Sequence, residues 1–422
     1  MEVQPGNGTQ WTEPDAERWL LSLENFGIEL GLGRIERLLG SLGSPQNLPG
    51  LIHVVGSNGK SSVTRMIAAI LHEHGLSVGA YLSPHFVSFA ERILIDGSQT
   101  SAAEFSKAAE SVNAAISLLE KAEPTLGPVT QFEALTAIAF LELKRAKVQS
   151  AVIEAGLGGR LDATNVIDSA VQVCTGISLE HTALLGETTP EIAREKLAVV
   201  RPGSTLVIPA DFDPDALSVA VDRCAEQGAR LVVAGRDAPA QLAVGGQFQR
   251  SNFALAAAAA HALLGSLDGS AVERAAASLV IPGRFELVDS RPTTILDGAH
   301  NGAGGEALAR SLQAEAHGGA TVGCLSVLDD KDAEAMLTAL GSCSDELIFT
   351  RASHPRAIDP AALAALNERL GGPPGRIVEA PHDALAKARA AAGAEGLAFA
   401  AGSLYLIADL KRGPRAAGGS TL

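Results

Sequence analysis

Short apolar runs alternate with segments of helical periodicity along most of the chain, and this alternation limits the possible folds more than any other feature. Strands that alternate with helices predict parallel sheets covered by helices. A first series of expected strands precedes the stretch IPGRFE, and a second series follows it. The strands of the first series are expected at 52–55, 78–81, 151–154, 171–177 and 205–208. The strands of the second series are expected near 294–297, 321–327, 346–350, 376–379 and 397–401. We therefore expect an α/β protein with two domains, residues 1–288 and 289–422.

The stretch IHVVGSNGKSS, residues 52–62, places glycines between an apolar strand and a helix. The first N–H groups of a helix have no partner and the helix dipole is positive there, so such a junction favours an anion. The glycines can adopt turns that other residues avoid, Lys60 can neutralise phosphate oxygens, and Ser61 or Ser62 can reach Mg²⁺. The stretch carries only the Gly-Lys-Ser half of a P-loop pattern. It predicts a nucleoside triphosphate as ligand, with a plain strand-turn-helix corner as the alternative.

An acidic residue ends the expected strand 151–154 and is followed by a glycine-rich loop. Ligands of parallel sheets bind at the carboxyl ends of strands. A buried carboxylate is costly unless it is paired, and Mg²⁺ beside a triphosphate would pair Glu154. We therefore predict Glu154 as a metal ligand. In the loop, Arg160 and Asp162 either contact a ligand or form a salt bridge with each other.

Three further residues follow strands and have both a functional and a structural interpretation. Ser83 could bind Mg²⁺ or start a Ser-Pro turn. His181 could coordinate a cation or be an ordinary surface histidine, and Lys196 could be functional or belong to a solvated helix face. In the second series, Asp297 could accept hydrogen bonds from ribose hydroxyls, and His300 could face a phosphate.

Bulk properties exclude several classes of protein. The formal charge of −15 argues against a nucleic-acid or anionic-membrane partner, because either would require a basic surface. The four cysteines are far apart and read as reduced core residues. No basic, apolar leader and no apolar run of about 18 residues is apparent, so we expect a cytoplasmic protein.

Taken together, the motifs resemble the folylpolyglutamate synthase/dihydrofolate synthase family of the Mur ligase superfamily over almost the whole chain. The matching stretches, in order, are ENFGIELGLGRIERLL (24–39), GSNGKSS, YLSPHFVSFAERI, TQFEALTAIAF (130–140), EAGLGGRLDATNV, EHTALLGETTPEIAREK, PGRFE, LDGAHN, DKD (330–332), SHPRA (353–357) and GSLYL.

The resemblance implies an N-terminal P-loop-type ATPase domain with a parallel-rich sheet and a C-terminal Rossmann-like domain. It implies ATP and Mg²⁺ as cofactors, with Ser83, Glu154 and His181 as metal ligands. Lys196 matches the family lysine that is carbamylated, and we assign Lys60, Lys196 and His181 catalytic roles. The nucleotide would be held by Gly56, Ser57, Asn58, Gly59, Lys60, Ser61, Ser62, Asn252, Arg284, Asp297 and His300. The pterin-bearing substrate would meet Gly31, Leu32, Gly33, Arg34, Thr130, Gln131, Phe132, Glu133, Arg160 and Asp162.

Several positions depart from the usual family pattern. Ser57 and Ser61 replace other small residues of the loop, Glu180 stands where aspartate is usual, and Phe248 where many members have histidine. Gly302 replaces a proline. The proposed magnesium ligands are nevertheless complete, so we expect an active enzyme.

The expected activity is addition of L-glutamate to dihydropteroate, to the γ-carboxylate of a folate, or to both, by a monomer. The acceptor carboxylate would attack the γ-phosphate of ATP, and the glutamate amine would then attack the acyl phosphate. The alternatives are a Mur-type ligase for a UDP-sugar peptide, a nucleotide-binding regulator without ligase activity, and a simple phosphotransferase or NTP hydrolase.

Overall fold

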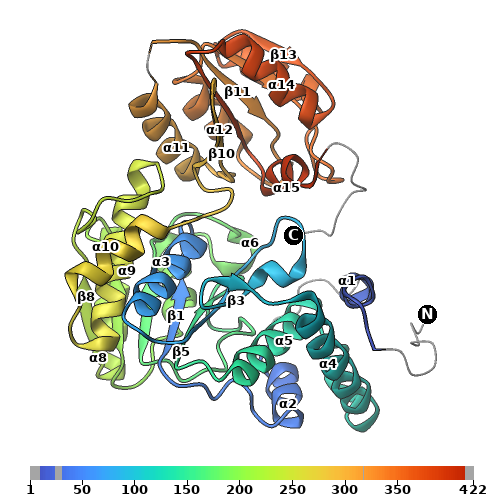
Figure 1. Ribbon diagram of the computed structural model, residues 1–422, viewed down its shortest axis with the longest axis vertical. Helices are drawn as coiled ribbons and strands as arrows, with labels where there is room; N and C mark the ends of the chain where they lie inside the picture. The colour runs from blue at the N-terminus through green and yellow to red at the C-terminus, as the bar shows by residue number, and fades with distance from the viewer. Residues whose placement is uncertain (1–9, 24–30, 317, 414–422) are drawn as a thin grey trace. The chain divides into compact units, whose positions relative to one another are not determined.

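A computed structural model describes residues 10–23, 31–316 and 318–413 (Figure 1). Contacts divide the chain into two compact units, Met1–Gln241 with Ser251–Leu279, and Leu242–Arg250 with Val280–Leu422. The division after Leu279 precedes the domain boundary expected at 288, which therefore stays a prediction. Residues 24–30 of the motif at 24–39 lie outside the described ranges.

The first unit contains an eight-stranded sheet made of β1 (Leu51–Val55), β2 (Val78–Tyr81), β3 (Ile93–Ile95), β4 (Ser98–Gln99), β5 (Ser150–Glu154), β6 (Val171–Cys174), β7 (Thr205–Ile208) and β8 (Arg230–Val233). The strand order is β4-β3-β2-β5-β1-β6-β7-β8. The six strands from β2 to β8 pair in parallel, whereas β3 is antiparallel to both β2 and β4. The expected parallel-rich sheet is confirmed.

Helices of this unit connect the strands. They are α1 (Glu13–Leu23), α2 (Gly33–Ser41), α3 (Lys60–Glu73), α4 (Ala102–Ala122), α5 (Gln131–Ala146), α6 (Thr182–Leu185), α7 (Thr189–Leu197), α8 (Pro214–Gln227), α9 (Gln247–Leu264) and α10 (Gly269–Ser278), with single turns of 3-10 helix at Phe89–Arg92 and Pro124–Leu126. The division between the two units falls inside α9.

Strand β1 lies at the centre of the sheet, between β5 and β6. All five of its residues are buried, as expected for a strand that is apolar except at His53 and has a strand on each side. In the register, Val54 is opposite Glu154 and Val55 is opposite Cys174. The loops that follow these three parallel strands therefore leave the sheet at the same edge.

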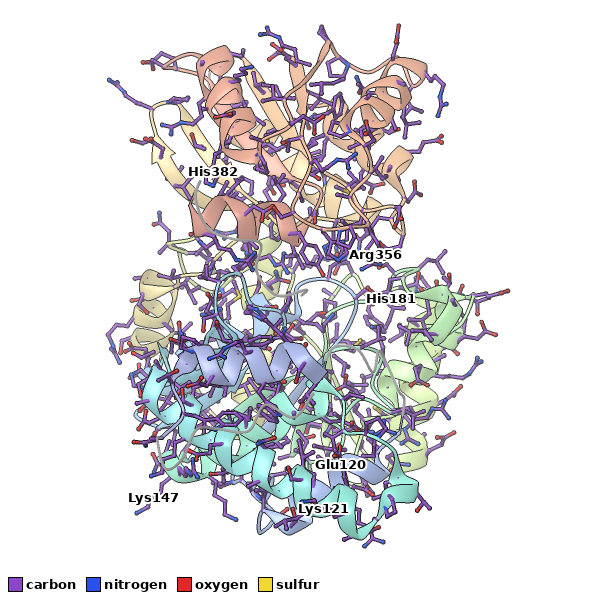
Figure 2. The ribbon with its side chains drawn as sticks, turned by 90° about the vertical axis from the view of Figure 1, so that its right-hand side faces the viewer. Glu120, Lys121, Lys147, His181, Arg356 and His382 are labelled. Carbon is purple, nitrogen blue, oxygen red and sulfur yellow. The ribbon has the colours of Figure 1, made fainter. Side chains whose placement is uncertain are left out.

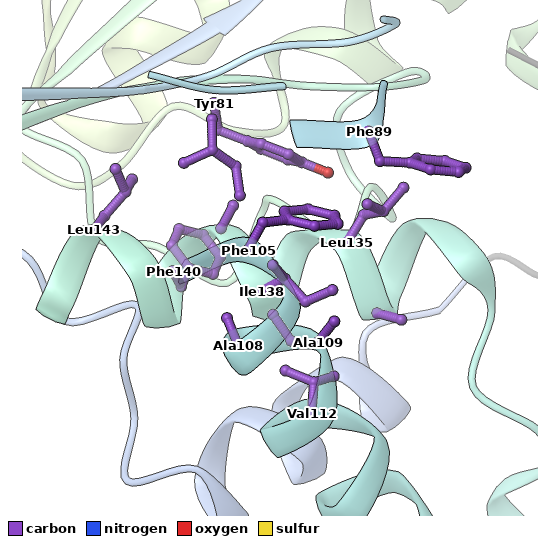
Figure 3. Packing of buried hydrophobic residues seen from close by; sticks show 14 of the residues in the cluster. Tyr81, Phe89, Phe105, Ala108, Ala109, Val112, Leu135, Ile138, Phe140 and Leu143 are labelled. Carbon is purple, nitrogen blue, oxygen red and sulfur yellow. The ribbon is translucent and has the colours of Figure 1, made fainter. Parts of the chain in front are cut away.

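A core of apolar side chains joins the sheet to α4 and α5 (Figure 3). The cluster includes Tyr81 of β2, Phe105 and Val112 of α4, and Phe140 of α5. Burial of each large side chain contributes about 1.5–3 kcal/mol. This packing fixes α5, whose first turn carries residues expected to bind substrate.

The second unit contains a six-stranded sheet made of β9 (Glu286–Ser290), β10 (Thr293–Leu296), β11 (Thr321–Leu325), β12 (Glu346–Phe349), β13 (Gly375–Ile377) and β14 (Leu397–Ala401). The order is β13-β12-β11-β14-β10-β9, parallel except for β9 at the edge. Its helices are α11 (Gly302–Glu315), α12 (Ala333–Gly341), α13 (Pro360–Arg369), α14 (Pro381–Ala392) and α15 (Leu404–Arg412). This is the alternating α/β arrangement that the second series of strands predicts.

Some strand ends differ from the expected ones. The strand expected at 171–177 ends at Cys174, and the strand expected at 321–327 ends at Leu325. After Cys174, the Thr175 N–H still donates to the Val55 carbonyl at 2.9 Å, while the Thr175 hydroxyl donates to the Asn58 carbonyl in the loop after β1. Strands β3, β4, β8 and β9 are not among the strands expected from the sequence.

Candidate functional site

The loop between β1 and α3 is shaped by two glycines in left-handed conformations. Gly56 has φ 137° and Gly59 has φ 83°, and α3 begins directly afterwards at Lys60. A Cβ atom on Gly56 would collide with Thr175, and one on Gly59 would lie 2.9 Å from the Asn252 side-chain oxygen. Both glycines are therefore required by conformation and by space.

This loop is anchored to the segment that follows β6. The Thr175 hydroxyl donates to the Asn58 carbonyl at 2.6 Å, and the Ser57 N–H donates to the Gly176 carbonyl at 2.9 Å. Thr175 is not among the site residues predicted from the sequence. The signal that could have found it is a hydroxyl residue at the carboxyl end of a strand next to the loop strand.

Lys60 folds back over the loop that precedes it. Its Nζ donates to the carbonyls of Gly56 at 2.9 Å and Ser57 at 3.1 Å. The ammonium group is thus held next to the first turn of α3, where helix N–H groups and the helix dipole also favour an anion. A cation and several backbone donors meet at one place, which is the arrangement that binds a phosphate chain.

Glu154 joins the end of β5 to the same region. Its carboxylate accepts a hydrogen bond from the Ser61 hydroxyl at 2.9 Å and another from the Ser83 N–H at 3.1 Å. The Ser61 hydroxyl also lies 3.1 Å from the Ser83 carbonyl oxygen. The structure therefore brings together Glu154, Ser61 and Ser83, three residues predicted to bind metal or nucleotide.

This group fits a magnesium ion by its chemistry. A carboxylate that is 1% exposed and a serine hydroxyl supply the hard oxygen atoms that Mg²⁺ prefers. His181, by contrast, is exposed, has φ 46° and precedes the short helix α6 (Figure 2). Across the described ranges, no three His, Cys, Asp or Glu side chains converge to hold a metal. The role of His181 as a third ligand stays a prediction.

Lys196 is buried, so its interpretation as part of a solvated helix face is wrong. Its side chain is 2% exposed, and its Nζ lies 2.7 Å from a Glu180 carboxylate oxygen. It also donates to the Gly56 carbonyl at 3.0 Å. α7 thus contributes a second lysine to the loop after β1, and Glu180 is a site residue whose role the sequence analysis did not assign.

The charge of Glu180 is set by these two lysines. Burial raises the pKa of this carboxyl group, but Lys60 and Lys196 outweigh burial and lower the pKa from 4.5 to about 2. The folded protein therefore binds this proton less tightly than the unfolded chain does. Its contribution to stability is complete above pH 4.5 and is lost as the pH falls toward 2.

Substitution of Glu180 with glutamine tests this pH dependence. The variant leaves Lys196 without its charge partner, so we expect a loss of roughly 3 kcal/mol of unfolding free energy near neutral pH. The difference from the unsubstituted protein should shrink as the pH falls below 4.5, as measured by urea unfolding. The control is Glu226→Gln, which removes an exposed partner of Arg223 and should show little pH dependence. An equal destabilisation by Glu180→Gln at every pH would contradict the assigned charge.

The glycine-rich loop after β5 touches both α5 and α7. A Cβ on Gly156 would lie 2.6 Å from the Phe132 ring, and one on Gly159 would lie 2.5 Å from the Lys196 carbonyl oxygen. Arg160 pairs with Glu195 at 2.8 Å rather than with Asp162. The loop therefore connects an expected substrate residue with an expected catalytic one.

The two segments expected to receive the pterin meet each other. Arg34, in the first turn of α2, places its Nε 3.1 Å from both carboxylate oxygens of Glu133. Glu133 also closes the N-terminus of α5 in a capping box with Thr130. Helix α2 begins at Gly33, directly after Gly31 and Leu32. The side-chain amide of Gln131 donates to the Leu20 carbonyl at 3.0 Å.

The predicted residues of the second unit also gather at one place. Both Asp297 oxygens accept backbone N–H groups, from Phe285 and from Ala299, each at 2.7 Å. The Arg284 guanidinium lies against Gly298, whose carbonyl is 2.8 Å from His300 Nδ1. Burial raises the pKa of Asp297, and the nearby Arg284 opposes this shift. Asp297 thus shapes the turn that carries Arg284.

Residues 283–404 match the protein family described as "Mur ligase, glutamate ligase domain". A relative from Mycobacterium tuberculosis, named dihydrofolate synthase/folylpolyglutamate synthase, is 36% identical over 401 residues, which cover 85% of this chain and 82% of the relative. The chain belongs to the folylpolyglutamate synthase/dihydrofolate synthase family. The family resemblance of its motifs is thereby confirmed.

Solved structures of this family have the same fold. Mycobacterium tuberculosis folylpolyglutamate synthase complexed with ADP is 32% identical, with a TM-score of 0.87 over 95% of this chain and 98% of that one. A bifunctional folylpolyglutamate synthase/dihydrofolate synthase with Mn, AMPPNP and L-glutamate bound is 30% identical, with a TM-score of 0.83 over 96% of this chain and 99% of that one.

Two further relatives are longer than this chain. They are probable bifunctional folylpolyglutamate synthase/dihydropteroate synthases of Halobacterium salinarum and Haloferax volcanii, 35% and 33% identical. This chain spans about half of their length, 51% and 50%. Among the helices that the structure describes, none combines the length and the apolar character needed to cross a membrane.

Proposed function

We propose that this protein is an ATP-dependent ligase that joins the amino group of L-glutamate to the carboxylate of dihydropteroate or to the γ-carboxylate of a folate. The observation that carries the proposal is that the first turn of α3 holds both Lys60, which folds back onto the loop after β1, and Ser61, which is hydrogen-bonded to Glu154. The names and bound ligands of the family members support it.

A carboxylate is a poor electrophile near neutral pH, so amide formation needs a better leaving group. In the proposed reaction, an oxygen of the acceptor carboxylate attacks the γ-phosphorus of ATP, giving an acyl phosphate and ADP. The amine of glutamate then attacks the acyl carbon, and inorganic phosphate leaves with the electron pair of the broken C–O bond. The amine loses a proton as the amide forms.

The residues of the chain supply position and charge in this scheme. The loop N–H groups and Lys60 bind and neutralise the phosphate oxygens. Glu154, Ser83 and His181, together with the Ser61 hydroxyl, would hold Mg²⁺, which when bound withdraws charge from the transferring phosphoryl group. Lys196 supports the loop through the Gly56 carbonyl. Carbamylation of Lys196 stays a proposal for a second state of the site, because it would replace the ammonium group by an anion and end the ion pair with Glu180.

The remaining assignments belong to the same proposal. Arg34 and Glu133, with the loop that contains Arg160 and Asp162, would receive the pteridine-bearing substrate. Asn252, Arg284, Asp297 and His300 would contact the nucleotide. We propose residues 1–288 and 289–422 as the ATP-binding and glutamate-ligase domains of a cytoplasmic monomer. It would have neither a nucleic-acid nor a membrane partner, in keeping with a charge of −15.

The test is an assay of the purified protein with ATP, Mg²⁺ and labelled L-glutamate. Dihydropteroate and tetrahydrofolate are offered separately, and the products are identified by mass. We expect a product heavier by one glutamyl residue with at least one acceptor. Tight ATP binding without glutamate-stimulated hydrolysis would instead favour a nucleotide-binding regulator.

The predicted third metal ligand is tested by His181→Ala. If the imidazole binds Mg²⁺, its loss should lower turnover about tenfold or more at low Mg²⁺, with partial recovery at high Mg²⁺. Phosphate release measured across a Mg²⁺ titration checks this. A matched control is His261→Ala, because His261 is an exposed histidine of α9. A defect that does not respond to Mg²⁺ would remove His181 from the metal site.

A further inference from the structure

His53 is a polar residue at the centre of an apolar sheet. It lies in β1, between β5 and β6, and its side chain is completely buried. An aliphatic residue would fill this position without the cost of removing an imidazole from water. The imidazole also has one nitrogen, Nδ1, that meets no hydrogen-bond partner in the part of the chain that the structure describes. The cost of burying the imidazole must therefore be offset by a hydrogen bond of the other nitrogen, Nε2.

That nitrogen begins a chain of buried hydrogen bonds. His53 Nε2 lies 2.9 Å from the Thr164 hydroxyl oxygen, and the Thr164 hydroxyl donates to Asp162 Oδ1 at 2.5 Å. A threonine hydroxyl has one proton, which is given to the carboxylate here. Thr164 must therefore accept from His53, so the imidazole carries its proton on Nε2.

Asp162 connects this chain of hydrogen bonds to the backbone of the glycine-rich loop. Its Oδ2 accepts the Leu157 N–H at 2.8 Å, and its Oδ1 accepts the Thr164 N–H at 2.9 Å. Leu157 lies between Gly156, which is against Phe132, and Gly159, which is against Lys196. The carboxylate thus fixes the backbone of the loop between two site residues.

We propose that His53 is a positioning residue for the pteridine-bearing substrate, acting through Thr164 and Asp162 on the loop 156–160. The inference rests on the proposed function, since that function defines the substrate. His53 fixes the direction of the Thr164 hydroxyl, that hydroxyl fixes the Asp162 carboxylate, and the carboxylate holds the loop against Phe132. The phosphate loop is held by other residues, Thr175 and Lys196. The hydrogen bonds from His53 through Thr164 and Asp162 end on the backbone of the loop 156–160 and not on the phosphate loop, so their loss should weaken acceptor binding more than ATP binding.

The test compares Thr164→Val with Thr164→Ser. Valine keeps the shape of threonine but removes the hydroxyl, whereas serine keeps the hydroxyl and so is the matched control. We expect Thr164→Val to raise KM for the pteridine acceptor about tenfold, the size of one lost buried hydrogen bond. Thr164→Ser should stay within about twofold of the unsubstituted protein, and KM for ATP should change by less than twofold in both. A rise in KM for ATP equal to that for the acceptor, or no rise with valine, would overturn the proposal.

Variants of His53 extend the comparison. Glutamine keeps an N–H donor at about the reach of Nε2, so His53→Gln should retain more acceptor affinity than His53→Leu. Because both residues act through one chain, adding His53→Leu to Thr164→Val should have little further effect. Fully additive effects would mean that the two residues act separately, which is contrary to the proposal.

The proton position on His53 can be tested by NMR spectroscopy, without any measurement of ligase activity. Near neutral pH, the ¹⁵N spectrum of the histidine-labelled protein should show one buried neutral ring with its proton on Nε2, assigned by its absence in His53→Gln. A proton on Nδ1, or a doubly protonated ring, overturns the chain of hydrogen bonds even if ligase activity is found. If neither acceptor yields product, the proposed function fails and the substrate role of His53 fails with it, whereas the spectrum still decides the hydrogen bonds.

Discussion

Replacing Lys60 with alanine is expected to reduce glutamate-dependent phosphate release by about 1,000-fold. The ammonium group is the cation that lies over the loop after β1, within 3.1 Å of two loop carbonyls. In phosphoryl transfer, charge on the γ-phosphate oxygens is stabilised mainly by fixed cations and N–H donors. Release of phosphate, measured with saturating ATP and each acceptor, checks the prediction.

The fold of this variant should remain intact. The Lys60 side chain is not fully buried, and its two carbonyl partners can be solvated when the amine is removed. The melting temperature should therefore change little. Lys121→Ala is the matched control, because Lys121 is an exposed lysine near the end of α4 and should leave turnover unchanged (Figure 2). Near-normal turnover of Lys60→Ala would refute the role assigned to the loop.

Buried parallel strands could be predicted because their sequences are almost uniformly apolar. β1, β5 and β14 are buried at every position, and each coincides closely with an expected strand. Among the missed strands, β4, β8 and β9 lie at sheet edges, whereas β3 lies next to an edge and is an apolar run of only three residues. β8 is largely exposed and β4 has only two residues. A pattern that depends on burial cannot identify a strand with one open side.

The loop after β1 was predictable from local sequence, but its partners were not. Gly56, Gly59 and Lys60 follow one another along the chain, so their arrangement is a property of the loop itself. Thr175 and Glu180 lie after another strand, and they reach the loop because β6 pairs with β1. Strand order is decided by packing of the whole sheet, and the sequence alone did not provide it.

Asp297 shows that a sequence pattern can locate a site residue without identifying its role. A carboxylate at a strand end suggests a ligand contact, and Asp297 was predicted to meet ribose. Both of its oxygens accept backbone N–H groups that shape the turn around Arg284. Because each carboxylate oxygen can accept more than one hydrogen bond, the structural role is compatible with the predicted contact. Sequence patterns locate such a residue but do not separate these two roles.

Replacing Glu154 with glutamine is expected to lower turnover at least about 100-fold and to raise the Mg²⁺ concentration needed for half-maximal activity. The side chain of glutamine has nearly the same shape, but it lacks the negative charge that attracts the metal. Its carbonyl oxygen can still accept the Ser83 N–H, and its NH₂ group can donate to the Ser61 hydroxyl oxygen. The variant should therefore fold, and the Mg²⁺ dependence of phosphate release measures the change.

A buried acid elsewhere in the first unit supplies the control. Glu142 is 3% exposed, accepts hydrogen bonds from Thr100 and Arg145, and lies toward the opposite end of α5 from Glu133. Glu142→Gln makes the same change of charge in a similarly buried place, so it should lower stability without altering the Mg²⁺ dependence. If both variants lost activity to the same extent, the effect of Glu154→Gln would come from general destabilisation. A shift in the Mg²⁺ requirement confined to Glu154→Gln would instead place the metal beside the Ser61 hydroxyl, against the phosphate chain that Lys60 faces.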